Sequence, residues 1–125
     1  MNKPTAEQIL KMEPGPELDA LFAEVVMRRQ LLEHKQYPAR NSWWEGKLFI
    51  CYQDDFKPSS NIAQAMEGVE RLEKELYQWS LSYQNNEYEF RIFRNFHFIC
   101  VGRDTELKEL AITRALIIWA MGKGE

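Results

Sequence analysis

Apolar residues recur at three- and four-residue steps between Pro58 and Leu76, which is the clearest helical pattern in the chain. They form one stripe on a helix surface: Ile62, Met66, Val69, Leu72 and Leu76. Pro58 disfavours a helical conformation in the residue before it. The short side chains of Ser59, Ser60 and Asn61 can accept the free amide protons of a first helical turn. The pattern predicts an amphipathic helix that begins at these three residues.

Two further helices are expected near the N-terminus. Thr5 and Gln8 have the spacing of a capping box, which predicts a short first helix. After a Pro-Gly break, Pro16 suits the first position of a second helix, which the pattern continues as far as Tyr37-Pro38. The apolar side of this second helix is predicted to consist of Leu18, Leu21, Phe22, Val25 and Leu32.

The last helix is predicted after a cap at Asp104 or Thr105, and it is apolar nearly all round from Leu110 to Met121. Such a helix is either deeply buried in its own chain or has one side against a partner chain. Its apolar surface exceeds what one core face buries. We therefore expect a homo-oligomer, at least a dimer, that assembles through the C-terminal helix.

Strict alternation of apolar and polar residues predicts a strand from Tyr77 to Tyr83. Asn85-Asn86 suits a two-residue hairpin turn, and this turn would place Trp79 opposite Ile92 and Leu81 opposite Phe90. A second turn at Arg94-Asn95 would bring the stretch 96–101 alongside. That stretch is apolar on both faces and therefore needs cover on both sides.

These elements predict an α/β fold in a single domain that spans residues 1–125. Lys47 to Tyr52 adds one more strand, which is rich in aromatic and β-branched residues. Because the strand at 96–101 needs cover on both faces, we expect a three-layer α/β/α sandwich with a small, mainly antiparallel sheet of about four strands.

Composition excludes some classes of function. The 16 basic and 19 acidic residues give a net charge of −3 without a basic block, which argues against binding to long nucleic acids. The N-terminal stretch lacks the apolar core of a signal peptide, and the longest apolar run, 115–121, is too short to span a bilayer. We expect a cytosolic protein without membrane association, in which Cys51 and Cys100 are reduced.

Three stretches resemble the phage ABA-sandwich domain, a family of small bacteriophage and prophage proteins. They are ILKMEPGPELDALFAEVVM, PSSNIAQAMEGVERL and DTELKELAITRALIIWAM, and they cover roughly half of the chain in the family's order. The Glu13–Asp19 stretch is the most specific part. The chain departs from the family's usual residues at Asn61, where Asp is usual, at Met66, where Trp is expected, and at Arg28-Arg29, where Gly-Trp is expected. The resemblance implies an α/β/α sandwich and supplies no catalytic residues.

No catalytic constellation is expected. His97 and Cys100 lie three residues apart on a predicted strand, so their side chains point to opposite faces. The histidines and Asp54-Asp55 lack metal-ligand spacing, and the chain has no Gly-rich phosphate loop. We therefore predict no enzyme activity, no metal and no cofactor.

The best candidate site is the start of the helix at Pro58, because free backbone amides and a partial positive charge at a helix start can hold an anion. The predicted ligand-binding residues are Trp43, Trp44, Ser59, Ser60, Asn61, Arg91, Arg94 and Arg114. Their rings would stack on a small anionic ligand, for example a nucleotide, and their guanidinium groups would grip phosphate. Alternatively, the polar residues only cap the helix, the tryptophans are core residues and Arg91 pairs with Glu89.

We expect a non-enzymatic bacteriophage or prophage accessory protein in the host bacterial cytoplasm. Its expected role is to capture a small anionic or nucleotide ligand such as a bacterial defence signal. This expectation follows from the resemblance and from analogy with small phage proteins that bind such signals. The alternative is an interaction protein that inhibits or redirects a host protein.

Overall fold

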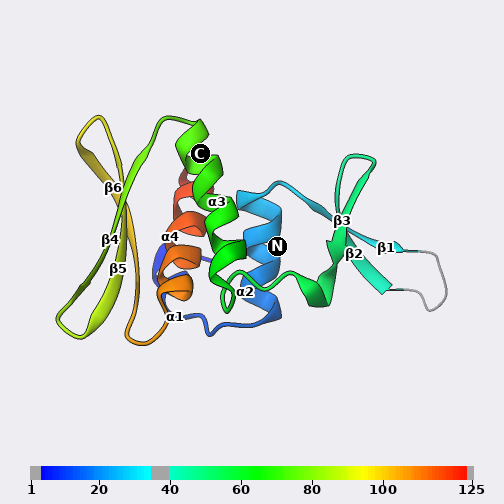
Figure 1. The fold of residues 1–125 in the computed structure, drawn as a ribbon, viewed down its shortest axis with the longest axis horizontal. Coiled ribbons are helices and arrows are strands. Elements are labelled where there is room, and N and C mark those ends of the chain that lie inside the picture. The colour runs from blue at the N-terminus through cyan, green and yellow to red at the C-terminus, as the bar shows by residue number, and fades with distance from the viewer. Residues whose placement is uncertain (1–3, 35–39, 124–125) are drawn as a thin grey trace.

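Helices form the middle of the molecule, and a three-stranded sheet lies on each side of them (Figure 1). The computed structural model describes residues 4–34 and 40–123. The elements in chain order are α1 (Ala6–Lys11), α2 (Pro16–Leu21), the π-helical turn η1 (Phe22–Val26), β1 (Gln30–His34), β2 (Arg40–Glu45), β3 (Leu48–Tyr52), the 3-10 turn η2 (Gln53–Asp55), α3 (Ile62–Lys74), β4 (Gln78–Gln84), β5 (Glu87–Arg94), β6 (His97–Asp104) and α4 (Lys108–Lys123).

The second helix is shorter than the sequence pattern predicts. Arg28 adopts a left-handed conformation with φ of 54°, and the Arg29 amide donates back to the Ala23 carbonyl at 2.9 Å. This backbone arrangement ends a helix. Leu32, which was expected on the helix, instead belongs to strand β1, and the expected stop at Tyr37-Pro38 lies outside the described residues.

The predicted central helix is confirmed as α3. Asn61 caps it by accepting the Gln64 amide at 3.1 Å. The helix ends before Leu76, which has φ of 66° and is 73% exposed. Leu76 therefore does not belong to the buried stripe, whereas Val69 and Leu72 do.

The predicted hairpin register is confirmed. β4 pairs with β5 so that Trp79 faces Ile92 and Leu81 faces Phe90. The second turn is displaced by one residue from the predicted position, because Asn95 and Phe96 are the residues with positive φ and Arg94 pairs with His97. Phe96 is therefore at the tip of the turn rather than in strand β6.

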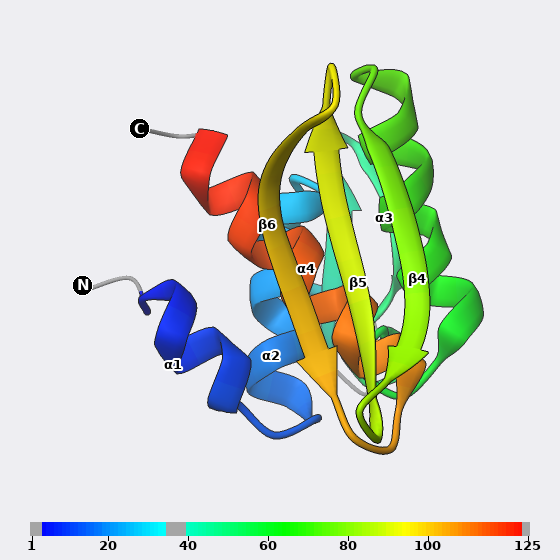
Figure 2. The same cartoon turned by 90° about the vertical axis from the view of Figure 1, so that its left-hand side faces the viewer.

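The α/β class is confirmed, but the layers and the strand count differ from the expected sandwich. The chain described here has two three-stranded antiparallel sheets, in the orders β1-β2-β3 and β4-β5-β6, rather than one sheet of about four strands. Helices lie on one face of the β4-β5-β6 sheet, and Figure 2 looks onto its other face. Three of the apolar residues that suggested cover on both faces are exposed, at 100% for Phe96, 57% for Phe98 and 45% for Ile99.

Helix α4 lies at the centre of the core. Every residue from Leu110 to Ile117 is buried, and the helix packs against β5 and β6 on one side and against α3 and η1 on the other. Burial within the chain accounts for the apolar character of α4. This removes the reason for expecting a subunit interface there. No helix in the described part of the chain is long and apolar enough to cross a membrane.

Candidate ligand-binding pocket

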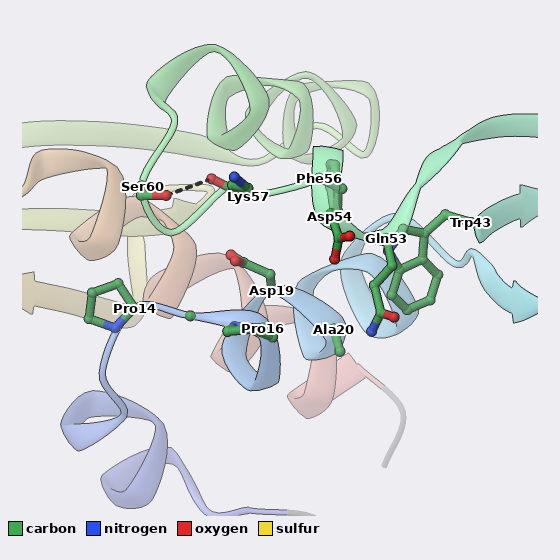
Figure 3. A pocket seen from close by; sticks show the side chains of 11 residues that line it. Pro14, Pro16, Asp19, Ala20, Trp43, Gln53, Asp54, Phe56, Lys57 and Ser60 are labelled. Carbon is green, nitrogen blue, oxygen red and sulfur yellow. Dashed lines mark hydrogen bonds between the residues drawn. The ribbon is translucent and has the colours of Figure 1, made fainter. Parts of the chain in front are cut away.

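A pocket of about 540 Å³ opens between α2, strand β2 and the loop that leads into α3. Its volume falls within the range usual for small-molecule sites. Figure 3 shows its lining side chains, which come from three separate parts of the sequence. The lining residues are Pro14, Gly15, Pro16, Asp19, Ala20, Trp43, Gln53, Asp54, Phe56, Lys57 and Ser60.

Asp19 is the buried polar residue of this pocket and is only 6% exposed. It lies on the first turns of α2, where Pro16 occupies an early helical position and fixes the entry of the chain. The carboxylate Oδ1 accepts the backbone amide of Ser59 at 2.8 Å. Ser59 in turn accepts the Gly15 amide on its Oγ at 3.2 Å. These bonds hold the loop before α3 against the start of α2 and keep the carboxylate at the pocket wall.

The surroundings of Asp19 shift the pKa of its carboxyl upward. Burial raises the pKa of its carboxyl above the ordinary value, and the hydrogen bonds from Ser59 and the charge of Lys57 offset only part of this rise. A carboxylate whose charge is disfavoured by burial gains from a ligand that donates hydrogen bonds or carries positive charge.

Apolar groups form much of the remaining wall. Trp43 is 1% exposed and Phe56 is 3% exposed, so both rings are packed into the body and present only part of their surface to the pocket. Phe56 is held in place by the Phe22 ring, with centroids 5.9 Å apart, and by the Arg29 guanidinium 4.8 Å from its centroid. The wall beside the carboxylate is therefore rigid and largely apolar.

The two carboxylates of the pocket face a common space. Figure 3 shows Asp19 pointing toward the loop that carries Lys57 and Ser60, while Asp54 faces the same space from the other side. Lys57 is the one cationic side chain among the described lining residues. The local charge balance is therefore slightly negative. This balance disfavours phosphate and favours a neutral or cationic ligand.

The structure brings together only part of the predicted site. Trp43 and Ser60 line the pocket, whereas Ser59 is fully buried behind it and Asn61 caps α3. Trp44 is the neighbour of Trp43 in β2 and contacts Phe49, with ring centroids 5.5 Å apart, and its Nε1 donates to Ser42. Because successive residues of a strand face opposite sides of the sheet, Trp43 and Trp44 cannot line one pocket.

The three predicted arginines lie elsewhere. Arg91 is on the open face of the β4-β5-β6 sheet and donates to Glu89 at 3.1 Å, which was the alternative considered for it. Arg94 lies over the Tyr77 ring, 5.0 Å from its centroid. Arg114 is buried in α4 and bonds to backbone carbonyls and to Asp104. The expected grouping of these arginines at the start of α3 is therefore wrong, because each has its own partners within the chain.

Asp19, Asp54 and Lys57 were not predicted as site residues. A signal for Asp19 is present in the sequence, because it precedes Phe22 by three residues and Ala23 by four and so lies on the buried side of α2. A charged residue on a buried helix face is rarely without a function or a specific partner. Asp54 lies in the short turn η2 and Lys57 lies in the loop after it, where side-chain periodicity carries no information.

The two cysteines lie outside the lining of this pocket. The Cys100 thiol donates to the Ala115 carbonyl at 3.6 Å, and burial raises its pKa to about 12. Burial also raises the pKa of Cys51. Both cysteines therefore remain thiols near neutral pH and are poor nucleophiles. The described residues contain no cluster of histidine, cysteine and acidic side chains suited to a metal ion.

In comparisons with known proteins, no family model, no curated protein and no solved structure matches the chain significantly. The assignment of the pocket therefore depends on its own geometry and charge.

Proposed function

We propose that this is a non-enzymatic binding protein that captures a small molecule in the Asp19 pocket. The observation that supports the proposal most strongly is a buried carboxylate at the wall of a pocket of about 540 Å³. Burial of a carboxylate costs free energy, because the charged group loses its hydration. A buried carboxylate in a cleft is therefore a candidate for a functional site. The apolar wall supplies contact area, and the carboxylate supplies orientation.

The charges of the pocket define the expected ligand. The carboxylates of Asp19 and Asp54 accept hydrogen bonds, and Trp43, Phe56 and the two prolines offer apolar contacts. The matching ligand is a compact molecule with an apolar or planar part and a donor group such as an amine, an amidine or the donor edge of a nucleobase. This ligand differs from the anionic one expected from the sequence, because the arginines that would grip phosphate lie elsewhere.

The biological setting remains a proposal that depends on the resemblance of three stretches to phage ABA-sandwich proteins. In that setting the protein acts as a bacteriophage or prophage accessory protein that withdraws a small signalling molecule from the host. The pocket supports the capture step of this proposal. An assay of defence signalling in bacteria that express the protein tests the setting, and unchanged signalling would contradict it.

A thermal-shift screen with three matched sets of small molecules, cationic amines, neutral amides and nucleotides, tests the proposed ligand class. A ligand present at about 100 times its dissociation constant stabilises the folded protein by about 2.7 kcal/mol. We expect several degrees of stabilisation from members of the amine or amide set and none from nucleotides. If only nucleotides stabilise the protein, the charge argument is wrong.

Two variants locate the bound molecule. Asp19→Asn removes the negative charge while preserving the shape of the side chain, and we expect it to weaken an amine ligand at least tenfold, which corresponds to about 1.4 kcal/mol. Glu17→Gln is the matched control, because Glu17 is an exposed acid on the same helix that does not line the pocket. Equal affinities for Asp19→Asn and wild type would show that the ligand binds elsewhere.

A second candidate function is the interaction protein considered from the sequence. Phe96 favours it, because this large apolar side chain is fully exposed at a turn and has φ of 68°, which is unusual for an aromatic residue. An exposed ring held at a hairpin tip can insert into an apolar pocket of another protein. A photo-crosslinking phenylalanine analogue at position 96 should then capture one specific host protein, and the absence of such a product would rule this function out.

A further inference from the structure

Strand β4 is an edge strand of its sheet and lacks the usual protection against pairing with another chain. The sheet order is β4-β5-β6, so β4 has a strand neighbour on one side only in the described structure. Its sequence, QWSLSYQ, contains no charged residue, no proline and no glycine. Its pairing with β5 is regular over its whole length, without a bulge. Charges, prolines and bulges are the devices with which natural edge strands avoid pairing.

The other edge of the same sheet is protected. Strand β6 carries the charged residues Arg103 and Asp104, and its pairing with β5 is interrupted by a register shift opposite Ile92 and Phe93. These features disfavour the addition of another strand. The contrast between the two edges indicates that any further strand pairs with β4.

The backbone of β4 is oriented for such pairing. Asn85 and Asn86 form the two-residue turn and have φ of 54° and 64°, as in a type I′ hairpin. In this kind of hairpin the residues that flank the turn exchange hydrogen bonds, and the bonding direction then alternates along the strand. Trp79, Leu81 and Tyr83 therefore direct their amide and carbonyl groups toward the open edge.

The sequence of β4 is nearly symmetric about Leu81. Serine lies on each side of Leu81, an aromatic residue follows at each next position, and glutamine stands at each end. If β4 of a second copy paired antiparallel to this strand about a two-fold axis at Leu81, the two Leu81 residues would face each other. Ser80 of each copy would then face Ser82 of the other, and Trp79 would face Tyr83. A two-fold interface requires this kind of self-complementarity, in which each patch matches its own copy.

The side chains near this axis have apolar surface left to bury. Leu81 is 38% exposed and Tyr83 is 57% exposed, although both project from the face of the sheet that α4 covers. Aromatic and aliphatic cross-strand pairs stabilise antiparallel strands. We propose that β4 pairs with β4 of a second copy about a two-fold axis at Leu81, so that two sheets join into one across a homodimer.

Light scattering on the full chain tests this inference. We expect a mass of about twice 14.9 kDa at about 100 μM, a concentration above the dissociation constants of even modest interfaces. A monomer at that concentration would overturn the proposal, as would open-ended aggregates, because a two-fold interface closes after two copies.

Charge substitutions at Leu81 test the position of the axis. Leu81→Lys and Leu81→Glu should each weaken the dimer about tenfold or more, because like charges would face each other at the axis. An equal mixture of the two variants should restore the dimer, because a lysine would then face a glutamate. Ile99→Lys on β6 is the matched control and should leave the dimer intact, since Ile99 is 45% exposed on the opposite edge.

A second variant covers the case in which substitutions at Leu81 unfold the protein. The double variant Ser80→Lys/Ser82→Lys places opposed lysines across the same axis on the open face of the sheet, where longer side chains have room. It should be a folded monomer by circular dichroism and light scattering. A stable dimer of this variant, or loss of the dimer in Ile99→Lys, would assign the interface to another surface.

Discussion

Replacing Gly102 with alanine should destabilise the fold by about 3 kcal/mol or more, which is among the largest effects expected for so small a change. Gly102 lies in β6 opposite Phe90, where the strand crosses α4. A methyl group there would overlap the backbone carbonyl of Ala111 and the backbone amide of Ala115, and it would lie 2.9 Å from the Ala115 side chain. Because backbone atoms of a central helix cannot move aside locally, the strand or the helix must shift. Urea unfolding measures the loss.

Gly122→Ala is the matched control, because it makes the same change near the end of α4, where an added Cβ has no neighbour within 4 Å. Alanine is favoured over glycine in a helix by up to about 1 kcal/mol, so this variant should be as stable as wild type or slightly more stable. If Gly102→Ala costs less than about 1 kcal/mol, then α4 does not pack against β6 as closely as described here.

Arg114→Ala should cost about 3–5 kcal/mol in stability, the range found when one partner of a buried ion pair is removed. Arg114 is 6% exposed and donates to the carbonyls of Arg103 and Met12 at 2.6 Å and to Asp104 at 3.1 Å. It thereby connects α4 to the loop after α1 and to the end of β6. Its removal takes the donor away from a partly buried acceptor at each place.

Arg91→Ala is the control for this prediction. The Arg91 side chain is 41% exposed, and its partner Glu89 retains a hydrogen bond from Arg103 at 2.9 Å. Exposed ion pairs contribute little, so we expect a cost below about 1 kcal/mol by the same unfolding measurement. Equal stabilities of the two variants would contradict the structural role of Arg114. A folded Arg114→Ala protein should also retain its affinity for a ligand of the Asp19 pocket.

Local patterns predicted the local structure well. The stripe from Ile62 to Leu72 became α3, and the alternation around Asn85-Asn86 became the β4–β5 hairpin in the expected register. These predictions were correct because helix caps, side-chain periodicity and hairpin turns depend on residues close together in the chain. The end of the second helix was mispredicted because Arg28 adopts a left-handed conformation, which an arginine seldom signals.

The arrangement of layers was harder to predict, because an apolar residue can be buried within the chain or remain exposed. The apolar side chains of α4 are covered by the chain itself, whereas Phe96 and Phe98 of the β5–β6 hairpin are exposed. Composition alone does not distinguish these cases. Strand β1 was missed because its residues were assigned to the second helix. Strand β2 was missed because Trp43 and Trp44 are both apolar and hide the alternation expected of a strand.

The residues of the pocket could also be predicted only in part from the sequence. Ser60 and Trp43 were predicted at the pocket from the helix start and the aromatic pair, and the structure places both there. Asp19 was missed because the residue that it contacts, Ser59, lies 40 residues later in the chain. The Asp19 carboxylate accepts the Ser59 backbone amide. Contacts of this kind depend on how α2 and the loop before α3 meet in space. The arginines were misplaced because their partners, such as the Met12 carbonyl of Arg114, are equally remote in sequence.

The most direct test of the proposed function is the titration of the Asp19 carboxyl by carbon-13 NMR, with and without an amine ligand from the screen. In the free protein we expect a pKa above the ordinary value of 3.8, because burial disfavours the charged form. A bound amine stabilises the carboxylate, so saturation should lower this pKa, and affinity should fall as the pH decreases through it. An Asp19 titration that is the same in the free and the ligand-saturated protein would show that the carboxylate does not contact the ligand, and it would contradict the assignment of this pocket.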